Sequence, residues 1–570
     1  MKKSFFAKIA ILVLTVVMVF SICACGSSDG NGEKEIVTVN KTLYVSLEQF
    51  EEVPVSHYEG QPEILLFEIN DAVENFLNGL VFGEFEEDGI TIKETDTTIV
   101  LTRKNGSYCE IDFVEDTIFF DDYDKFCANP VASNPHDLLS SNYENEAGKT
   151  IFLQRDSNIY TPGYNILIDL KERNIPLDIY GGKKYIPLQT FNDLFIAPYG
   201  ANIAYNGKAM FALPGGALSP ELAELYYLDK PTQRSDALAE FNYNELCLFF
   251  DLHYGLQDEH GFMDGFDDYF EKTGLKEQLL SKDPLDVFNA MNSLTLGYIA
   301  DSHSAVTGAS PYLGERMPSE GLDSITAHSI FVRLALDSQL EALRSQMLGE
   351  VKFYEKVGNT AYITFDEFSL SDKSAGYAES SFEDLDTIAI IVAAHAQIAK
   401  DEEIENVVVD LSCNGGGTVD SAVYLVAWML GYCDVSVYDS VTGSSATTSY
   451  KADVNLDGVF DEKDTVADKN LYCIVSPASF SCGNYAPTLL KASGMVTIVG
   501  KTSGGGACVV FPAVSADGTL FSISSARQMS TVVNGSYYHS DTGVEPDVVL
   551  TKYESFFDRV GLTDYLNSLK

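Results

Sequence analysis

The distribution of apolar positions divides the chain into parts with different predicted secondary structure. Residues 41–230 contain short strand-like runs, residues 231–350 carry apolar side chains at helical spacing, and residues 351–552 alternate between the two. Apolar residues three or four positions apart predict helices, and short apolar runs bounded by turn residues predict strands. Alternating strands and helices with short loops imply a layered α/β core for the third part. Residues 553–570 predict a C-terminal helix.

The second and third parts are regular enough for single elements to be predicted. The predicted helices cover residues 236–255, 283–299, 338–348, 384–399, 421–430 and 485–492, and the predicted strands cover residues 359–365, 407–411, 471–475 and 496–499. One strand, residues 471–475, runs through a turn of small residues into a helix. That layout presents a side chain and free backbone N–H groups at the carboxyl edge of a sheet. Ser481 stands at this turn.

The first part contains a diverged internal repeat. The heptapeptide YVSLEQF at residues 44–50 is echoed by YIPLQTF at residues 185–191, and an Asn-Gly pair follows each copy, at residues 105–106 and 206–207. Asn-Gly favours the type I′ turn of β-hairpins. The pattern is similar to small stalk modules of exported bacterial proteins, such as the amine-oxidase-like N-terminal repeat. We predict two α+β modules, residues 41–135 and 136–230, that act as a spacer or binding module.

The N-terminus has the features of a targeting segment. Lysines flank an apolar run at residues 9–24, which is shorter than the roughly 20 residues that span a bilayer. The run ends in ICACG and resembles the lipobox of bacterial lipoproteins. This resemblance implies that residues 1–24 are removed and that a lipid on Cys25 anchors the protein to the outer face of the cytoplasmic membrane. An ordinary cleaved signal peptide is the alternative. Residues 25–40 then predict a flexible tether.

Composition narrows the functional classes further. The 570 residues include 84 Asp and Glu against 37 Lys and Arg, which gives a formal net charge of −47. Binding to nucleic acid or to an anionic membrane surface needs basic residues, so both are excluded. The eight cysteines beyond Cys25 contain no C-x-x-C pair, which argues against a zinc ribbon or a thioredoxin-type site. Most lie in apolar surroundings and indicate buried thiols rather than disulfides, although the sequence leaves this open.

Three motifs occur in one order along the third part. They are VVDLSCNGGG at residues 408–417, SFSCGN at residues 479–484 followed by VGKT, and GVEPD at residues 543–547. Together they resemble the strand-and-turn, nucleophile and closing motifs of serine peptidase family 41, which contains the C-terminal-processing and tricorn-type peptidases. The resemblance implies a layered catalytic core of the ClpP–crotonase type, with Ser481 as the nucleophile. The alternative for Ser481 is an ordinary helix N-cap.

The resemblance also guides the choice of a general base. One branch of the family uses a lysine about two dozen residues after the serine, but residues 503–507 contain none. The tricorn-like branch uses a D-x-H-[ST] motif, which residues 301–304 match. A neutral imidazole accepts a proton near neutral pH, so we predict His303 as the base that activates Ser481. Ser302 is either a further hydrogen-bonding group of the site or a solvated loop hydroxyl.

The remaining catalytic groups are assigned by the same comparison. Asp541 is the carboxylate nearest the position of the family's acidic orienting residue, and a structural turn aspartate is the alternative. A tetrahedral intermediate needs N–H donors directed at its oxyanion. We predict the amide of Cys482 as one donor and an amide of Gly415 or Gly416 as the other.

A second motif is independent of the peptidase. Residues 453–464, DVNLDGVFDEKD, fit the D-x-[DN]-x-D-G pattern of calcium loops and resemble a dockerin-type loop. A solvated acidic loop is the alternative. The predicted ligands are Asp453, Asn455, Asp457, Val459, Asp461 and Asp464.

The sequence therefore predicts a membrane-tethered serine endopeptidase that cleaves peptides or unfolded protein tails outside the cytoplasm. It predicts no cofactor for catalysis and a structural Ca²⁺. An inactive peptide-binding or surface-adhesion lipoprotein of the same fold is the alternative. Cleavage specificity and oligomeric state are left open by the sequence.

Overall fold

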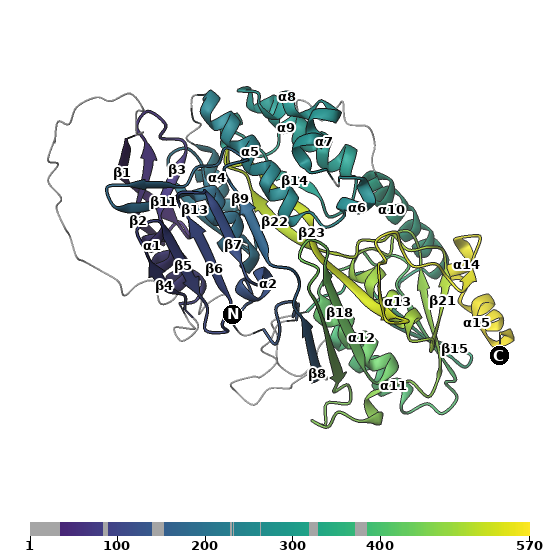
Figure 1. The fold of residues 1–570 in the computed structure, drawn as a ribbon. Coiled ribbons are helices and arrows are strands. Elements are labelled where there is room, and N and C mark those ends of the chain that lie inside the picture. Colours follow the sequence, from purple (N-terminus) through teal and green to yellow (C-terminus); the bar gives the residue numbers. More distant parts are fainter. Residues whose placement is uncertain are drawn as a thin grey trace, which may run out of the picture.

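The computed structural model describes residues 35–83, 89–130, 132–139, 153–228, 231, 233–262, 264–318, 329–370 and 385–569. The predicted signal peptide and Cys25 lie outside these residues. Within them, no helix combines the length and the apolar character needed to cross a bilayer. The described chain has mixed α/β structure built on four sheets (Figure 1).

Two sheets form the N-terminal part of the molecule. The larger has the strand order β10-β11-β3-β2-β1-β13-β12, and the smaller has the order β4-β5-β6-β7-β9. The strands of the larger sheet are β1 (Ile36–Tyr44), β2 (Phe50–Tyr58), β3 (Leu65–Glu68), β10 (Asp178–Tyr180), β11 (Lys183–Pro187), β12 (Ala201–Tyr205) and β13 (Met210–Pro214). The strands of the smaller sheet are β4 (Thr91–Glu94), β5 (Thr98–Thr102), β6 (Tyr108–Asp112), β7 (Thr117–Phe120) and β9 (Ile166–Asp169). The helical segments here are α1 (Ile69–Ala72), η2 (Val73–Val81), α2 (Tyr123–Phe126), α3 (Leu188–Phe191), η4 (Asn192–Ile196), η5 (Ala197–Tyr199) and α4 (Pro220–Leu228).

The predicted boundary between two separate modules at residue 135 is wrong. Strands from both repeat copies share both sheets, because β11 pairs with β3, β13 pairs in parallel with β1, and β9 pairs with β7. One hydrophobic cluster that includes Leu43, Phe120 and Phe191 spans both copies. A module of that size buries little apolar surface alone, which favours the shared core. The predicted tether is also too long, since β1 begins at Ile36 and pairs with β2 along its whole length.

Both predicted Asn-Gly hairpins are confirmed. Asn105 and Gly106 connect β5 to β6, and Asn206 and Gly207 connect β12 to β13. In each turn the Asn side chain accepts a hydrogen bond from the backbone N–H two residues later. The glycines have φ angles of 88° and 87°, which lie in the region that glycine adopts without strain.

Helices of the middle part pack against two strands that lie within residues 508–533. They are α5 (Asp236–His253), α6 (Gln257–His260), α7 (Phe266–Thr273), α8 (Leu275–Leu279) and α9 (Pro284–Asn292), which continues as the π-helical segment η6 (Ser293–Ile299). The rings of Phe249 and Phe250 on α5 lie 5.4 and 5.8 Å from the ring of Phe521. The short η7 (Pro311–Leu313) and the long α10 (Ser329–Leu348) follow.

The sheet that carries Ser481 has the order β15-β16-β17-β20-β21-β25 and is parallel from β16 onward. Its strands are β15 (Tyr354–Val357), β16 (Thr360–Thr364), β17 (Asn406–Asp410), β20 (Asn470–Val475), β21 (Val496–Gly500) and β25 (Val548–Val549). Helices α11 (Thr387–Ile398), α12 (Val419–Leu430) and α13 (Cys482–Ala492) cover one face, while α10, α14 (Glu554–Phe557) and α15 (Arg559–Ser568) cover the other. Val407 and Val409 pack toward the first face, and Val408 packs toward the second. Burial on both faces explains the continuous apolar runs of these strands.

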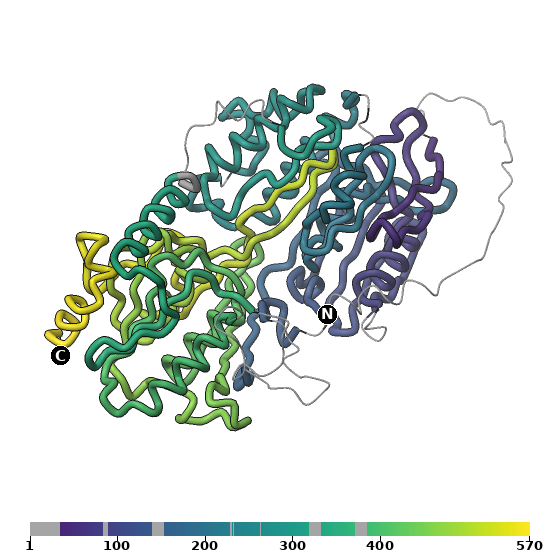
Figure 2. The backbone as a smooth tube through the Cα atoms, turned by 180° about the vertical axis from the view of Figure 1, so that it is seen from behind, coloured from purple at the N-terminus to yellow at the C-terminus, as the bar shows by residue number. Residues whose placement is uncertain are grey.

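A fourth sheet lies on the other side of α11–α13, with the order β14-β23-β18-β19-β8 and with β22 and β24 paired to β23. Its strands are β8 (Leu153–Thr161), β14 (Ala305–Gly308), β18 (Cys433–Asp439), β19 (Ser445–Ala452), β22 (Cys508–Val514), β23 (Leu520–Val533) and β24 (Ser536–Tyr538). The long β23 runs from its partner strand β18 to the middle helices (Figures 1 and 2). The predicted limits of the core at 351 and 552 are therefore wrong, because β8 and β14 complete its sheet through pairs with β19 and β23.

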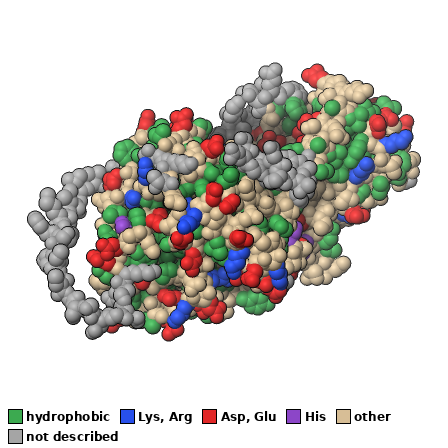
Figure 3. Space-filling model, turned by 90° about the horizontal axis from the view of Figure 1, so that it is seen from above, with side chains coloured by type: hydrophobic (Ala, Val, Ile, Leu, Met, Phe, Trp, Pro, Cys, Tyr) green, Lys and Arg blue, Asp and Glu red, His purple; other side chains and the backbone are tan. Residues whose placement is uncertain are grey.

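This architecture confirms the predicted fold class, a layered α/β core with a preceding helical part and an N-terminal α+β region. The eight cysteines beyond Cys25 are buried and unpaired, as predicted. Asp and Glu side chains spread over the face shown in Figure 3, in keeping with the acidic composition.

Candidate active site

Ser481 lies at the turn between β20 and α13. Its backbone has φ 54° and ψ −122°, a conformation that costs a non-glycine residue on the order of 1–3 kcal/mol. Its N–H donates to the Gly505 carbonyl at 3.0 Å, and its own carbonyl accepts from Asn484 and Tyr485, both at 2.8 Å. The half-buried side chain makes no capping hydrogen bond. Ser481 therefore occupies the N-cap position of α13 without making the capping hydrogen bond, which leaves its hydroxyl available.

The glycine turn after β17 packs directly against Ser481. Parallel pairing of β17 with β20 brings the turns that follow them to one edge of the sheet. Phe480 N–H donates to the Asn414 carbonyl at 3.0 Å, which links the two turns. Gly416 has φ +106°, and a Cβ added to it would lie 2.7 Å from the Cβ of Ser481. Only glycine fits this position without displacing Ser481.

The Cys482 amide is the first backbone donor of α13. The next two amides, of Gly483 and Asn484, donate to the carbonyls of Phe480 and Ser481. Among the described residues, no acceptor is found for the Cys482 amide. A free N–H next to Ser481, at the positive end of a helix dipole, can stabilise a developing negative charge.

His303 belongs to a turn that Asp301 holds in place. The Asp301 carboxylate accepts from the backbone N–H of His303 at 3.0 Å and of Ser304 at 2.7 Å. It also accepts from the hydroxyls of Tyr254, Ser304 and Ser524. The Ser522 hydroxyl donates to the His303 carbonyl at 2.8 Å, which ties the turn to β23. The motif thus fixes the backbone of His303.

The His303 imidazole packs on Phe480, the residue before Ser481, with 4.8 Å between the ring centroids. His303 is 9% exposed, its Nδ1 has no hydrogen-bond partner, and no hydrogen bond joins its ring to the Ser481 hydroxyl. Burial lowers the pKa of His303 to about 4, against the opposing effect of Asp301 and with a smaller contribution from Arg333. The ring is therefore neutral at neutral pH, the form that accepts a proton.

Residues 359–550 match the family model described as Peptidase family S41. The match identifies this part of the chain, about a third of its length, as a domain of peptidase family S41. The chain is therefore a serine-type peptidase, and its substrates are peptides or proteins. The matched residues include the glycine turn, Ser481 and the GVEPD turn, whereas His303 lies outside them.

Solved structures share low sequence identity with this S41 peptidase. A candidate peptidase from Parabacteroides merdae is 15% identical with a TM-score of 0.39, over 55% of this chain and 89% of that one. A lipoprotein from Streptococcus agalactiae is 15% identical with a TM-score of 0.34, over 60% and 99%. The tricorn protease is 10% identical with a TM-score of 0.31, over 84% and 59%. These TM-scores are below 0.5, so the family assignment rests on the sequence match. No curated protein matches the chain.

Asp541 does not contact His303, which contradicts its predicted role as the residue that orients the imidazole. Its Oδ1 accepts from the Ala507 N–H at 2.9 Å, and its carbonyl accepts from the Gly506 N–H at 3.2 Å. Burial raises its pKa, with Asp301 adding to the effect. Because the adjacent Gly505 carbonyl accepts from the Ser481 N–H, Asp541 is linked to the Ser481 backbone through the loop of residues 503–507.

The predicted glycine oxyanion donors are also engaged elsewhere. The Gly415 N–H donates to the Asp366 carbonyl and the Gly416 N–H donates to Asn414 Oδ1, both at 3.0 Å. A turn of this kind closes on its own polar groups, so the expectation of a free glycine amide is wrong for this structure. The role of Gly416 here is steric.

Three further residues shape the site. The Phe480 ring contacts His303 on one side, and the Arg333 guanidinium lies over the Phe480 ring, 4.4 Å from its centroid. Asn484 is fully buried; it donates to the Ser540 carbonyl at 2.9 Å and accepts from the Ser503 hydroxyl at 2.7 Å. These contacts join segments that are far apart in the chain, so no pattern in a single sequence predicts them. The Ser302 side chain is half-buried and has no hydrogen bond among the described residues.

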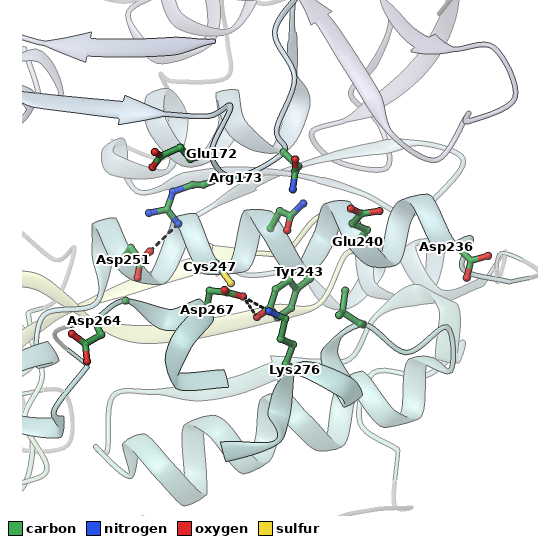
Figure 4. A pocket seen from close by; sticks show the side chains of 14 residues that line it. Glu172, Arg173, Asp236, Glu240, Tyr243, Cys247, Asp251, Asp264, Asp267 and Lys276 are labelled. Atoms are coloured by element: carbon green, nitrogen blue, oxygen red, sulfur yellow. Dashed lines mark hydrogen bonds and ion pairs between the residues drawn. The ribbon is translucent and has the colours of Figure 1, made fainter. Parts of the chain in front are cut away.

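A cavity of about 640 Å³ lies away from this site. It opens between α5, α7 and the turn that carries Arg173, and acidic side chains dominate its lining (Figure 4). Arg173 pairs with Asp251 at 2.8 Å, and Asp267 accepts from Tyr243 and Lys276. The predicted calcium ligands lie in the loop between β19 and β20 and do not line this cavity.

Proposed function

We propose that this S41 peptidase cleaves internal peptide bonds through an acyl-enzyme, with Ser481 as the nucleophile and His303 as the general base. The observation that carries the proposal is the turn at Ser481. At this turn the Ser481 hydroxyl makes no capping hydrogen bond, and the Ser481 backbone is strained. The neighbouring Cys482 amide has no acceptor among the described residues. The neutral imidazole of His303 packs on the ring of Phe480.

In the proposed reaction, His303 takes the Ser481 proton as Oγ attacks the scissile carbonyl. The oxygen of the tetrahedral intermediate accepts from the Cys482 N–H. The imidazolium then gives its proton to the leaving amine, and water attacks the acyl-enzyme by the same steps in reverse. Substrate binding completes the Ser481–His303 hydrogen bond, since catalytic hydrogen bonds are often loose without substrate.

A fluorophosphonate probe tests this proposal directly. It should label the wild-type chain covalently and leave Ser481→Ala unlabelled, while His303→Gln should label at least 10-fold more slowly. Ser493→Ala, at the opposite end of α13, is the matched control, because the Ser493 hydroxyl bonds only to the local helix end. Equal labelling of wild type and Ser481→Ala would overturn the assignment.

The second candidate function is peptide binding without catalysis. Two observations favour it, namely the unpartnered His303 Nδ1 and the absence of a hydrogen bond between His303 and Ser481. It predicts that fluorophosphonate does not label the folded chain, whereas a peptide library still yields ligands. Labelling at Ser481 decides against it.

We also propose that the enzyme works outside the cytoplasm, tethered through a lipid on Cys25. The support is the lipobox-like ICACG sequence after a short apolar run. Metabolic incorporation of an alkyne-labelled fatty acid should mark the wild-type chain and not Cys25→Ala. Cys25→Ala should also release the protein from the membrane fraction, whereas an ordinary signal peptide predicts no fatty-acid label on either chain.

A further inference from the structure

The loop of residues 453–464, between β19 and β20, has no part in the proposed peptidase chemistry. It carries five acidic residues and one basic residue. Leu456 has φ +61° and Gly458 has φ +80°, so the backbone bends sharply at the centre of the loop. Asp453, at the first position of the motif, directly follows the last residue of β19.

Asp453 is buried and only partly satisfied. It is 1% exposed, and its Oδ2 accepts from the Gly458 N–H at 2.9 Å. Its Oδ1 is buried and accepts no hydrogen bond. Leaving a buried carboxylate oxygen unpaired costs free energy that a bound cation would recover.

The loop also carries side-chain oxygens at the other ligand positions of the calcium motif. Asn455 Oδ1 accepts from Asp457 N–H, and Asp457 Oδ1 accepts from Val459 N–H, both at 2.9 Å. Asp464 is 3% exposed and accepts three backbone N–H bonds, from Val454, Asn455 and Asp461. Among the described residues, no three His, Cys, Asp or Glu side chains are grouped to hold a metal ion. The four Asp carboxylates of the motif are thus not gathered around one point in this structure, and a bound ion would draw them together. Together with the amide oxygen and the backbone carbonyl of the motif, they form a set of oxygen donors that selects a hard cation.

We propose that residues 453–464 form a Ca²⁺ site, with Asp453 as its essential ligand. Asn455, Asp457, Asp461 and Asp464 supply further side-chain oxygens, and Val459 supplies its carbonyl. The site does not depend on the proposed peptidase mechanism.

The contacts of the loop indicate what the ion would stabilise. The Tyr424 hydroxyl donates to the Asp453 carbonyl at 2.9 Å, and the Val466 N–H donates to the Trp428 carbonyl at 3.1 Å. The Trp428 indole donates to His395 Nδ1 at 3.2 Å, and His395 also hydrogen-bonds the backbone of Lys463. Both ends of the loop are thus fixed to α12, and one is also fixed to α11. Ca²⁺ that binds only the folded loop would therefore stabilise the packing of the loop on α11 and α12, because it shifts the folding equilibrium towards the folded state.

Trp428 makes the proposal measurable without an activity assay, because it is the single tryptophan of the chain. The full-length chain, purified in detergent and freed of metal by chelation, is titrated with CaCl₂ while tryptophan emission and Tm are recorded. Calcium should change the emission saturably and raise Tm by about 2–5 °C at 100-fold excess over Kd. Mg²⁺ at the same concentration should have a smaller effect, because it demands a more rigid octahedral site.

Asp453→Asn is the decisive variant, because it keeps an acceptor for Gly458 and removes one charge. It should bind Ca²⁺ at least 10-fold more weakly. Glu462→Gln is the matched control, since it removes one charge from an exposed position of the same loop that the motif does not use. It should bind within 2-fold of wild type. Asp457→Asn, also exposed, replaces Asp453→Asn if that variant does not fold, and it should weaken binding as well.

The outcomes separate the site from a general acidic surface. No response of wild type up to 10 mM Ca²⁺ overturns the proposal, because calcium loops of this kind bind at about 1 mM or below. Equal weakening in Asp453→Asn and Glu462→Gln would also overturn it, since that result indicates charge screening rather than coordination.

Discussion

Gly416 and Ser481 pack so closely that no methyl group fits between them. A Cβ on Gly416 would lie 2.7 Å from Ser481 Cβ and 2.8 Å from the Phe480 carbonyl oxygen. The φ of +106° at Gly416 is also unfavourable for any L side chain. The turn after β17 therefore fixes by steric contact the position of the turn that carries Ser481.

Gly416→Ala should accordingly displace Ser481. We expect fluorophosphonate labelling to fall at least 10-fold, with a loss of about 1–3 kcal/mol of unfolding free energy from overpacking and backbone strain. Gly415→Ala is the control, because a Cβ there meets nothing within 4 Å and its φ is not in the left-handed region. Wild-type labelling of Gly416→Ala would show that the two turns are not rigidly coupled.

The pH dependence of labelling should report the buried His303. Its pKa of about 4 means that the imidazole stays neutral, and able to accept a proton, down to about pH 5. Labelling should hold from pH 8 to pH 5 and fall as the imidazole is protonated below that, with a midpoint near 4 rather than the ordinary value near 6.5.

Circular dichroism at each pH separates protonation of His303 from acid unfolding.

Arg333→Gln removes a positive charge that lowers the His303 pKa, so the midpoint of the labelling curve should move to higher pH. A wild-type midpoint near 6.5 would mean that His303 is solvated in the working enzyme.

The local elements of the core were predictable from sequence because each is determined by its own neighbours. The apolar run before Asp410 forms β17, and the small-residue turn at Ser481 leads into α13, which begins directly after it. The spacing of the apolar residues and the types of residue in the turns carry this information.

Long-range partners were not predictable. β8 joins the sheet of β19 from almost 300 residues away, and β14 joins β23 from more than 200. The same limit applies to the site. Spacing placed Asp541 near the correct turn, but only the fold shows that its carboxylate binds the Ala507 amide rather than the His303 ring.

Asp541→Asn distinguishes the two roles of this carboxylate. A positioning residue needs only an acceptor for the Ala507 N–H, which an amide oxygen supplies, so Asp541→Asn should label within 10-fold of wild type. Asp541→Ala removes the acceptor and should label more slowly than Asp541→Asn. An orienting residue of a Ser-His-Asp triad would instead lose about 10⁴-fold on the Asn substitution. Second-order labelling rates of the three proteins decide between these roles.

The C-terminal helix α15 contributes a buried ion pair to the core. Arg559 Nη2 lies 2.7 Å from Asp410 Oδ2, and the two side chains are 5% and 0% exposed. The other Asp410 oxygen accepts from the Ser412 N–H at 3.0 Å, at the start of the glycine turn. Arg559→Ala would leave a buried carboxylate without its counter-charge, so we expect a loss of about 3–5 kcal/mol of unfolding free energy.

Urea and thermal unfolding measure this loss. Lys272→Ala removes a charge from the exposed pair with Asp268 and should leave the free energy of unfolding almost unchanged, because exposed ion pairs contribute little. Because much of the penalty comes from the stranded Asp410, the double variant Asp410→Asn/Arg559→Ala should be more stable than Arg559→Ala. If the double variant were instead less stable by the sum of the single effects, Asp410 and Arg559 would act independently, and α15 would hold the core through apolar contacts alone.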